Sequence, residues 1–117
     1  MIESDAIRLR HMLDAAQRAM SFAARRSRED LDKDEMLTLS LVKCIEIIGE
    51  AATKVSDECQ KTNPGIPWDD IIGMRNRLIH AYFDINRDIV WSTITEDLPS
   101  LVAELKAVLP DESEQQT

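Results

Sequence analysis

The residues best suited to chemistry lie together in one short segment of an otherwise apolar stretch. They are Arg75, Asn76, His80 and Tyr82. Arginine binds a phosphate through paired hydrogen bonds and keeps its charge at physiological pH. Histidine titrates near neutral pH, so it can act as a general acid or a general base. A fixed cation, an amide, a proton-transfer group and a phenol in one segment indicate phosphodiester chemistry.

The spacing of the surrounding apolar residues predicts a helix over residues 67–82. Arg75 and Tyr82 fall in the middle of its apolar face, and Asn76 and His80 are four apart and within reach of each other. Arg75 and His80 lie about 140° apart around a straight helix. They can therefore face one phosphate only if the helix loosens near His80 or if a dimer brings two such segments together.

A structural role is the simpler alternative for Arg75. A guanidinium within an apolar face is costly unless an anion meets it. Glu46 and Glu50 are one helical turn apart in an earlier segment, and they are either partners of Arg75 or surface carboxylates. A buried phenol with a hydrogen bond in the core is the corresponding structural role for Tyr82.

The elements that must position these residues are predicted to be helices. Apolar residues recur at spacings of three and four along most of the chain, and there are only three glycines and four prolines. We expect an all-α fold, an up-down bundle of four main helices plus a short extra helix. The main helices are expected over residues 4–26, 35–61, 67–82 and 87–109, with the short one within 27–34. Pro99 should kink or split the last helix.

One domain, residues 1–110, accounts for nearly all of the 117 residues, and residues 111–117 are expected to form an acidic flexible tail. The helix over 35–61 is apolar on more than one side, so it needs two partners. We expect the second partner to be another copy of the chain, which gives a homodimer. Gly49 interrupts this helix, and close approach of another helix would explain it.

The segment around these polar residues resembles that of a known family. Arg75 to Tyr82 is similar to the R-x4-H-x-Y motif of HepT-type toxins, which belong to the HEPN superfamily of small helical ribonucleases. The flanks agree, and the resemblance covers about residues 5–109. The flanking segments that carry it are Ile66-Pro67-Trp68, Phe83-Asp84-Ile85-Asn86, Val90-Trp91 and Leu98-Pro99-Ser100-Leu101.

The resemblance implies a HEPN-like domain that works as a dimeric, metal-independent endoribonuclease and as the toxin of a toxin–antitoxin pair. Arg75 would bind the scissile phosphate, His80 would be the acid or base, and Asn76 would orient His80 or the substrate. The implied partners are RNA and an MntA-type nucleotidyltransferase antitoxin, which would attach AMP to Tyr82. No cofactor is implied, and a larger assembly with the antitoxin is compatible with it.

Composition limits the location and chemistry of the chain. No stretch approaches 18 uninterrupted apolar residues, and Cys44 and Cys59 are expected to be buried thiols in a reducing cytoplasm. The scattered cysteines and histidines do not form a metal site.

The net charge of −8 opposes long-range attraction of RNA, although residues 1–28 carry six Lys/Arg against three Asp/Glu. Their cluster Arg25, Arg26 and Arg28 either complements a helix end or meets RNA phosphate.

Three functions from different classes remain after this reasoning. The first is a ribonuclease toxin with Arg75, Asn76, His80 and Tyr82 in its site. The second is a non-catalytic helical subunit that binds a nucleotidyltransferase or presents its substrate. The third is a plain dimeric bundle in which Arg75 forms a structural ion pair.

Overall fold

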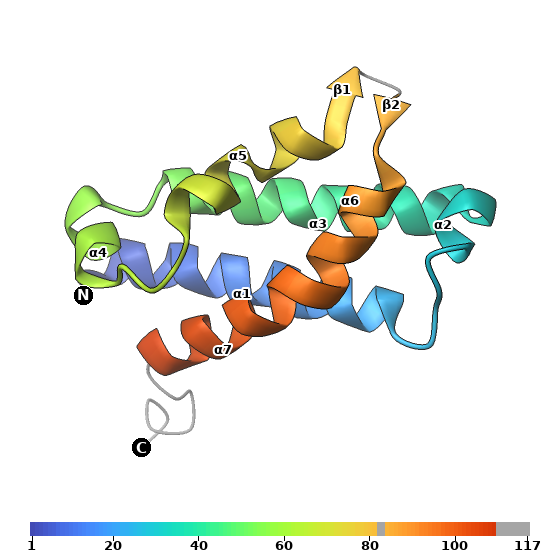
Figure 1. The fold of residues 1–117 in the computed structure, drawn as a ribbon. Helices are drawn as coiled ribbons and strands as arrows, with labels where there is room; N and C mark the ends of the chain where they lie inside the picture. The colour runs from blue at the N-terminus through green and yellow to red at the C-terminus, as the bar shows by residue number, and fades with distance from the viewer. Residues whose placement is uncertain (82–83, 110–117) are drawn as a thin grey trace.

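Two long antiparallel helices form the centre of the molecule. The computed structural model describes residues 1–81 and 84–109, with only the backbone given for residues 80 and 81. α1 (Glu3–Ala23) and α3 (Glu35–Thr53) run side by side, and the short α2 (Asp30–Lys33) connects them at one end (Figure 1). The predicted all-α character is confirmed, and the expected acidic tail lies outside the described residues.

Two further helical segments pack on this pair. α5 (Trp68–Leu78) lies along α3, and the segment made of α6 (Arg87–Ser92), the π-helical turn Thr93–Asp97 and α7 (Leu98–Val108) crosses obliquely (Figure 1). The expected disturbance near Pro99 takes the form of this π-helical turn directly before α7. Pro99 is the second residue of α7, which directly follows the π-helical turn, so its missing N–H coincides with the change of helical hydrogen-bond pattern.

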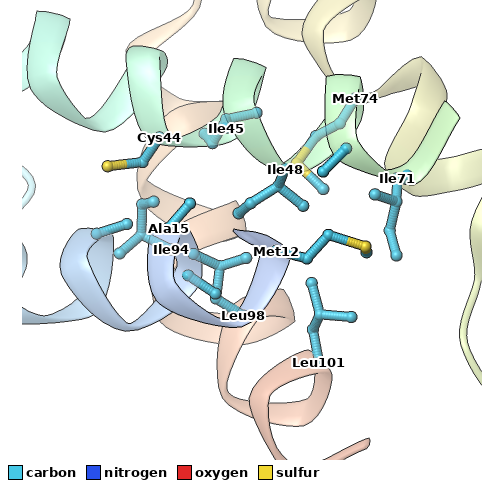
Figure 2. Close-up of a cluster of buried hydrophobic side chains, with 14 of the residues drawn as sticks. Met12, Ala15, Cys44, Ile45, Ile48, Ile71, Met74, Ile94, Leu98 and Leu101 are labelled. Carbon is cyan, nitrogen blue, oxygen red and sulfur yellow. The ribbon is translucent and has the colours of Figure 1, made fainter. Parts of the chain in front are cut away.

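The core is formed where these helices meet. Ile48, fully buried, lies near the centre of the cluster in Figure 2. The side chains labelled around it come from α1, α3, α5 and the last helical segment, so the core is buried only when all of them pack together. They are Met12 and Ala15 from α1, Cys44 and Ile45 from α3, Ile71 and Met74 from α5, and Ile94, Leu98 and Leu101 from the last segment.

The prediction of one helix over residues 35–61 is wrong. α3 ends at Thr53, and a separate helix, α4 (Asp57–Thr62), follows. The cause is a capping arrangement that involves α1. The Ser56 side chain accepts a hydrogen bond from the Cys59 N–H at 3.2 Å, which starts α4. Asp5, a buried carboxylate of α1, accepts bonds from the Ser56 N–H at 2.8 Å and hydroxyl at 2.7 Å, so the turn is fixed by a residue far away in sequence.

The prediction of a helix over residues 67–82 is also wrong at its end. α5 ends at Leu78, and the chain continues into a small antiparallel pair, β1 (Ile79–Ala81) and β2 (Asp84–Ile85). Ile79 pairs with Ile85, and the Asn86 N–H donates to the Leu78 carbonyl at 2.7 Å. Because that carbonyl bonds to the returning chain, the backbone turns away from the helix at this point.

Within the described residues, no helix is both long enough and apolar enough to cross a membrane.

Candidate functional site

Arg75 lies on α5 beside the place where α5 packs closely on α3. A Cβ added at Gly49 of α3 would lie 3.4 Å from the Ile71 carbonyl oxygen of α5. The expected close approach at Gly49 is therefore confirmed. Glu46 precedes Gly49 by about one helical turn, so it lies beside the same contact. The Arg75 Nε donates to the Glu46 Oε1 at 3.0 Å, which links the two helices at the surface.

The helical pattern predicted that Arg75 lies in the middle of the apolar face of α5. This prediction is wrong. The buried side of α5 consists of Trp68, Ile71, Met74 and Leu78, and Arg75 lies at its border with 55% of its side chain exposed. Of the two candidate carboxylates, Glu46 is the partner. Glu50 instead accepts from the Lys54 Nζ at 3.3 Å. Because the guanidinium is already exposed, it can bind an anion from solvent without any change in the core.

The end of α5 changes the relation between Arg75 and His80. Asn76 is exposed in the last turn of the helix, whereas the His80 backbone belongs to β1. The predicted helical contact between Asn76 and His80 therefore does not apply. The angle of a straight helix no longer limits Arg75 and His80 either, because the helix ends between them. The roles of His80 and Tyr82 stay predictions, since Tyr82 and the His80 side chain lie outside the described residues.

Arg75 forms one wall of a groove between α1 and α3. This α1–α3 groove has a volume of about 360 Å³. Sequence reasoning missed most of it, because its residues come from three helices. The available signal was the pair Arg8 and His11, one turn apart on α1 and outside its apolar seam. The groove is lined by Arg8, His11, Lys43, Glu46, Ile47, Glu50, Ala51, Lys54 and Arg75.

Two of the three arginines that follow α1, Arg26 and Arg28, form ion pairs instead of complementing the helix end. Arg26 contacts Asp34 at 2.8 Å, and Arg28 contacts Asp88 at 2.6 Å. The hydrogen bond to Asp34 raises the pKa of Arg26, and the same bond lowers the pKa of Asp34. These contacts tie the α1–α2 connection to α2 and α6, so these two arginines have a structural explanation.

Both cysteines are buried and free, as expected from the sequence. Burial raises the pKa of the Cys44 and Cys59 thiols, which keeps them protonated and poorly reactive. Among the described residues, no group of three His, Cys, Asp or Glu side chains is arranged to hold a metal ion.

Comparison with known proteins gives consistent matches. A family model described as ribonuclease HepT-like matches residues 12–108. A protein of Caldanaerobacter subterraneus subsp. tengcongensis, named as an inferred RNase, is 38% identical over 104 residues, which are 89% of this chain and 93% of that protein. An inferred ribonuclease HepT of Thermococcus cleftensis is 38% identical over 73 residues, 62% of this chain and 66% of its own length. No solved structure gives a significant match.

Replacing Arg75 by alanine should lower the free energy of unfolding by less than about 1 kcal/mol, because exposed ion pairs contribute roughly 0.2–1 kcal/mol. Urea denaturation followed by circular dichroism measures this. Ile71→Ala, on the buried side of the same helix, is the contrasting variant and should cost about 2–5 kcal/mol. An equal loss in both variants would show that Arg75 mainly holds the fold together.

Proposed function

Because the chain belongs to the HepT-like ribonuclease family, we propose that it is the toxin of a toxin–antitoxin pair and cleaves RNA without a metal ion. Arg75, Asn76 and His80 are the proposed catalytic residues. The observation that carries this proposal is the placement of Arg75. Its guanidinium is exposed, lines a groove and, among the described residues, is held by one carboxylate, that of Glu46.

The proposed reaction uses the RNA's own 2′-hydroxyl. The 2′-oxygen attacks the neighbouring phosphorus while a base takes its proton, and an acid gives a proton to the departing 5′-oxygen. Arg75 stabilises the negative charge that builds up on the phosphate oxygens. For this it must exchange Glu46 for phosphate, which costs little because exposed pairs of this kind are weak. His80 supplies one proton-transfer step, and Asn76 orients His80 or the substrate.

A homodimer is part of the proposal, because one chain contributes one motif histidine and the reaction needs both an acid and a base. We propose a four-helix up-down bundle, residues 1–110, that pairs with a second copy and forms the cleft between the two. Large apolar side chains that remain exposed in the single chain support this. Leu39 and Ile47 on α3 are 49% and 40% exposed, and Ile72 on α5 lies near Arg75 in sequence with 36% exposed.

The alternative is a non-catalytic helical partner that presents substrate to a nucleotidyltransferase. The net charge of −8 favours it, since an acidic body is better suited to a protein partner than to RNA. The local charge around Arg75 favours the ribonuclease instead, because the α1–α3 groove contains more cations than carboxylates.

The first test is cleavage of a mixed RNA pool in the presence of EDTA. We expect the wild type to cleave, and Arg75→Ala and His80→Ala each to lose about 10²-fold or more in rate. Arg77→Ala is the matched control. Arg77 lies on the same helix but bonds to Asp70, at 3.5 Å between side chains and 3.1 Å to the carbonyl, so its loss should leave cleavage nearly unchanged.

These variants must be compared at equal folding and oligomeric state. Equal activity in the wild type and His80→Ala would point to a contaminating nuclease and remove the catalytic assignment. Absence of activity in all of them, for a chain whose mass shows no modification, would leave the non-catalytic partner as the better proposal.

The dimer is tested by Leu39→Glu, which places a charge in the proposed apolar interface. Sedimentation velocity should show a dimer for the wild type and mainly a monomer for this variant, with cleavage reduced in parallel. Glu35→Gln, at the exposed start of the same helix, is the control and should stay dimeric. A wild type that remains monomeric at micromolar concentration would overturn this part of the proposal.

We also propose that a nucleotidyltransferase antitoxin neutralises the chain at Tyr82. The phenol oxygen would attack the α-phosphorus of ATP, form the AMP ester and release pyrophosphate. Because Tyr82 is the only tyrosine in the chain, any tyrosine-linked product identifies the position. Incubation with the antitoxin, ATP and Mg²⁺ should add AMP to the wild type and abolish RNA cleavage. Tyr82→Phe should gain no AMP, and mass addition to that variant would contradict the assignment.

A further inference from the structure

We propose that the α1–α3 groove is a binding track for the backbone of single-stranded RNA, in which Arg8 and Lys43 hold the phosphates next to the one bound by Arg75. This inference rests on the proposed ribonuclease function and extends it to residues outside the motif.

The charge of the groove is opposite to that of the whole chain. Four Lys/Arg side chains and two glutamates line it, in a protein whose net charge is −8. The cations come from all three helices that surround the groove, so they form one surface only in the folded chain. They are Arg8 from α1, Lys43 in α3, Lys54 at its end and Arg75 from α5.

The cations of the groove are available to a new anion. In the part of the chain that the structure describes, neither Arg8 nor Lys43 forms an ion pair, and Lys54 is held only by the exposed Glu50. The arginines that follow α1 differ in this respect, because Arg26 and Arg28 already contact carboxylates. Among the described residues, the groove thus keeps two cations, Arg8 and Lys43, without a carboxylate partner, whereas two of the three arginines after α1 are paired.

The shape of the groove selects a single strand. The α1–α3 groove has a volume of about 360 Å³, and on this ground we propose that it takes one extended backbone and not a duplex. A second hollow of about 540 Å³ shares His11, Lys43 and Ile47 with the groove and continues toward Phe22 and Leu39. Lys43 lies between Leu39 and Ile47 on one side of α3, so the proposed track runs along the edge of the proposed interface between copies and toward Arg75.

The test measures binding without cleavage. A fluorescent 2′-O-methyl oligoribonucleotide lacks the attacking hydroxyl, so fluorescence anisotropy reports affinity alone. The variant is Arg8→Gln with Lys43→Gln. The control is Lys61→Gln with Lys106→Gln, which removes the same charge from exposed sites on α4 and α7 that do not line the groove.

Each phosphate contact contributes about 0.7 to the slope of log affinity against log salt for a single strand. The groove variant should therefore show a slope that is smaller than the wild-type slope by about 1.4. Its loss of affinity relative to the wild type should be about 25-fold greater at 0.1 M salt than at 1 M salt. The control should stay within about twofold of the wild type. Unfolding temperature and sedimentation must match between variants, and a loss of affinity that only follows loss of the dimer overturns the proposal.

The other outcomes separate this inference from the proposed function. If the groove variant and the control bind alike while the wild type cleaves RNA, the binding track is wrong and the ribonuclease assignment stands. If a 2′-O-methyl duplex binds more tightly than the single strand, the single-strand assignment is wrong. If the wild type neither binds nor cleaves RNA, both proposals fall together.

Discussion

The contact of α5 with α3 at Gly49 determines where the candidate chemistry lies. Because Gly49 has no side chain, the backbone of α5 near Ile71 approaches α3 directly. This brings Arg75 within hydrogen-bonding distance of Glu46 and places it at the edge of the α1–α3 groove. The core residues Ile71 and Met74 hold α5 in this position from the buried side (Figure 2). The site therefore depends on packing, and the surface ion pair only adjusts the direction of the guanidinium.

Periodicity predicts the helices well because it reports the buried side directly. In the last helix Leu98, Leu101 and Leu105 recur at spacings of three and four, and all three are buried. The ends of helices were predicted poorly, because long-range bonds determine them. Asp5 fixes the turn at Ser56, and the returning chain at Asn86 bonds to the last carbonyl of α5. No local pattern contains these partners.

The site was predictable in its residue types and less so in its geometry. The motif identified Arg75, but its place at the border of the buried side depends on how α5 is rotated against α3, which sequence spacing gives only approximately. The sequence left the choice between Glu46 and Glu50 open for the same reason. The two residues are one turn apart on α3, and only the packing of α5 decides which of them contacts Arg75. Local spacing pairs Arg8 with His11 on α1 but does not connect Arg8 or Lys43 with Arg75, because their proximity to Arg75 exists only in the folded chain.

The end of α5 before His80 makes the proposed chemistry compatible with the fold. In a continuous helix the fixed angle between Arg75 and His80 would direct one of them away from a phosphate bound by the other. Because α5 ends at Leu78, the backbone at His80 follows β1, and the direction of the two side chains is no longer coupled by helical geometry. This removes the spacing of the motif as a reason for proposing a dimer. Proton transfer remains a reason, since an acid and a base are both needed and each chain has one motif histidine. The exposed apolar side chains of α3 and α5 are a further reason that does not depend on the motif.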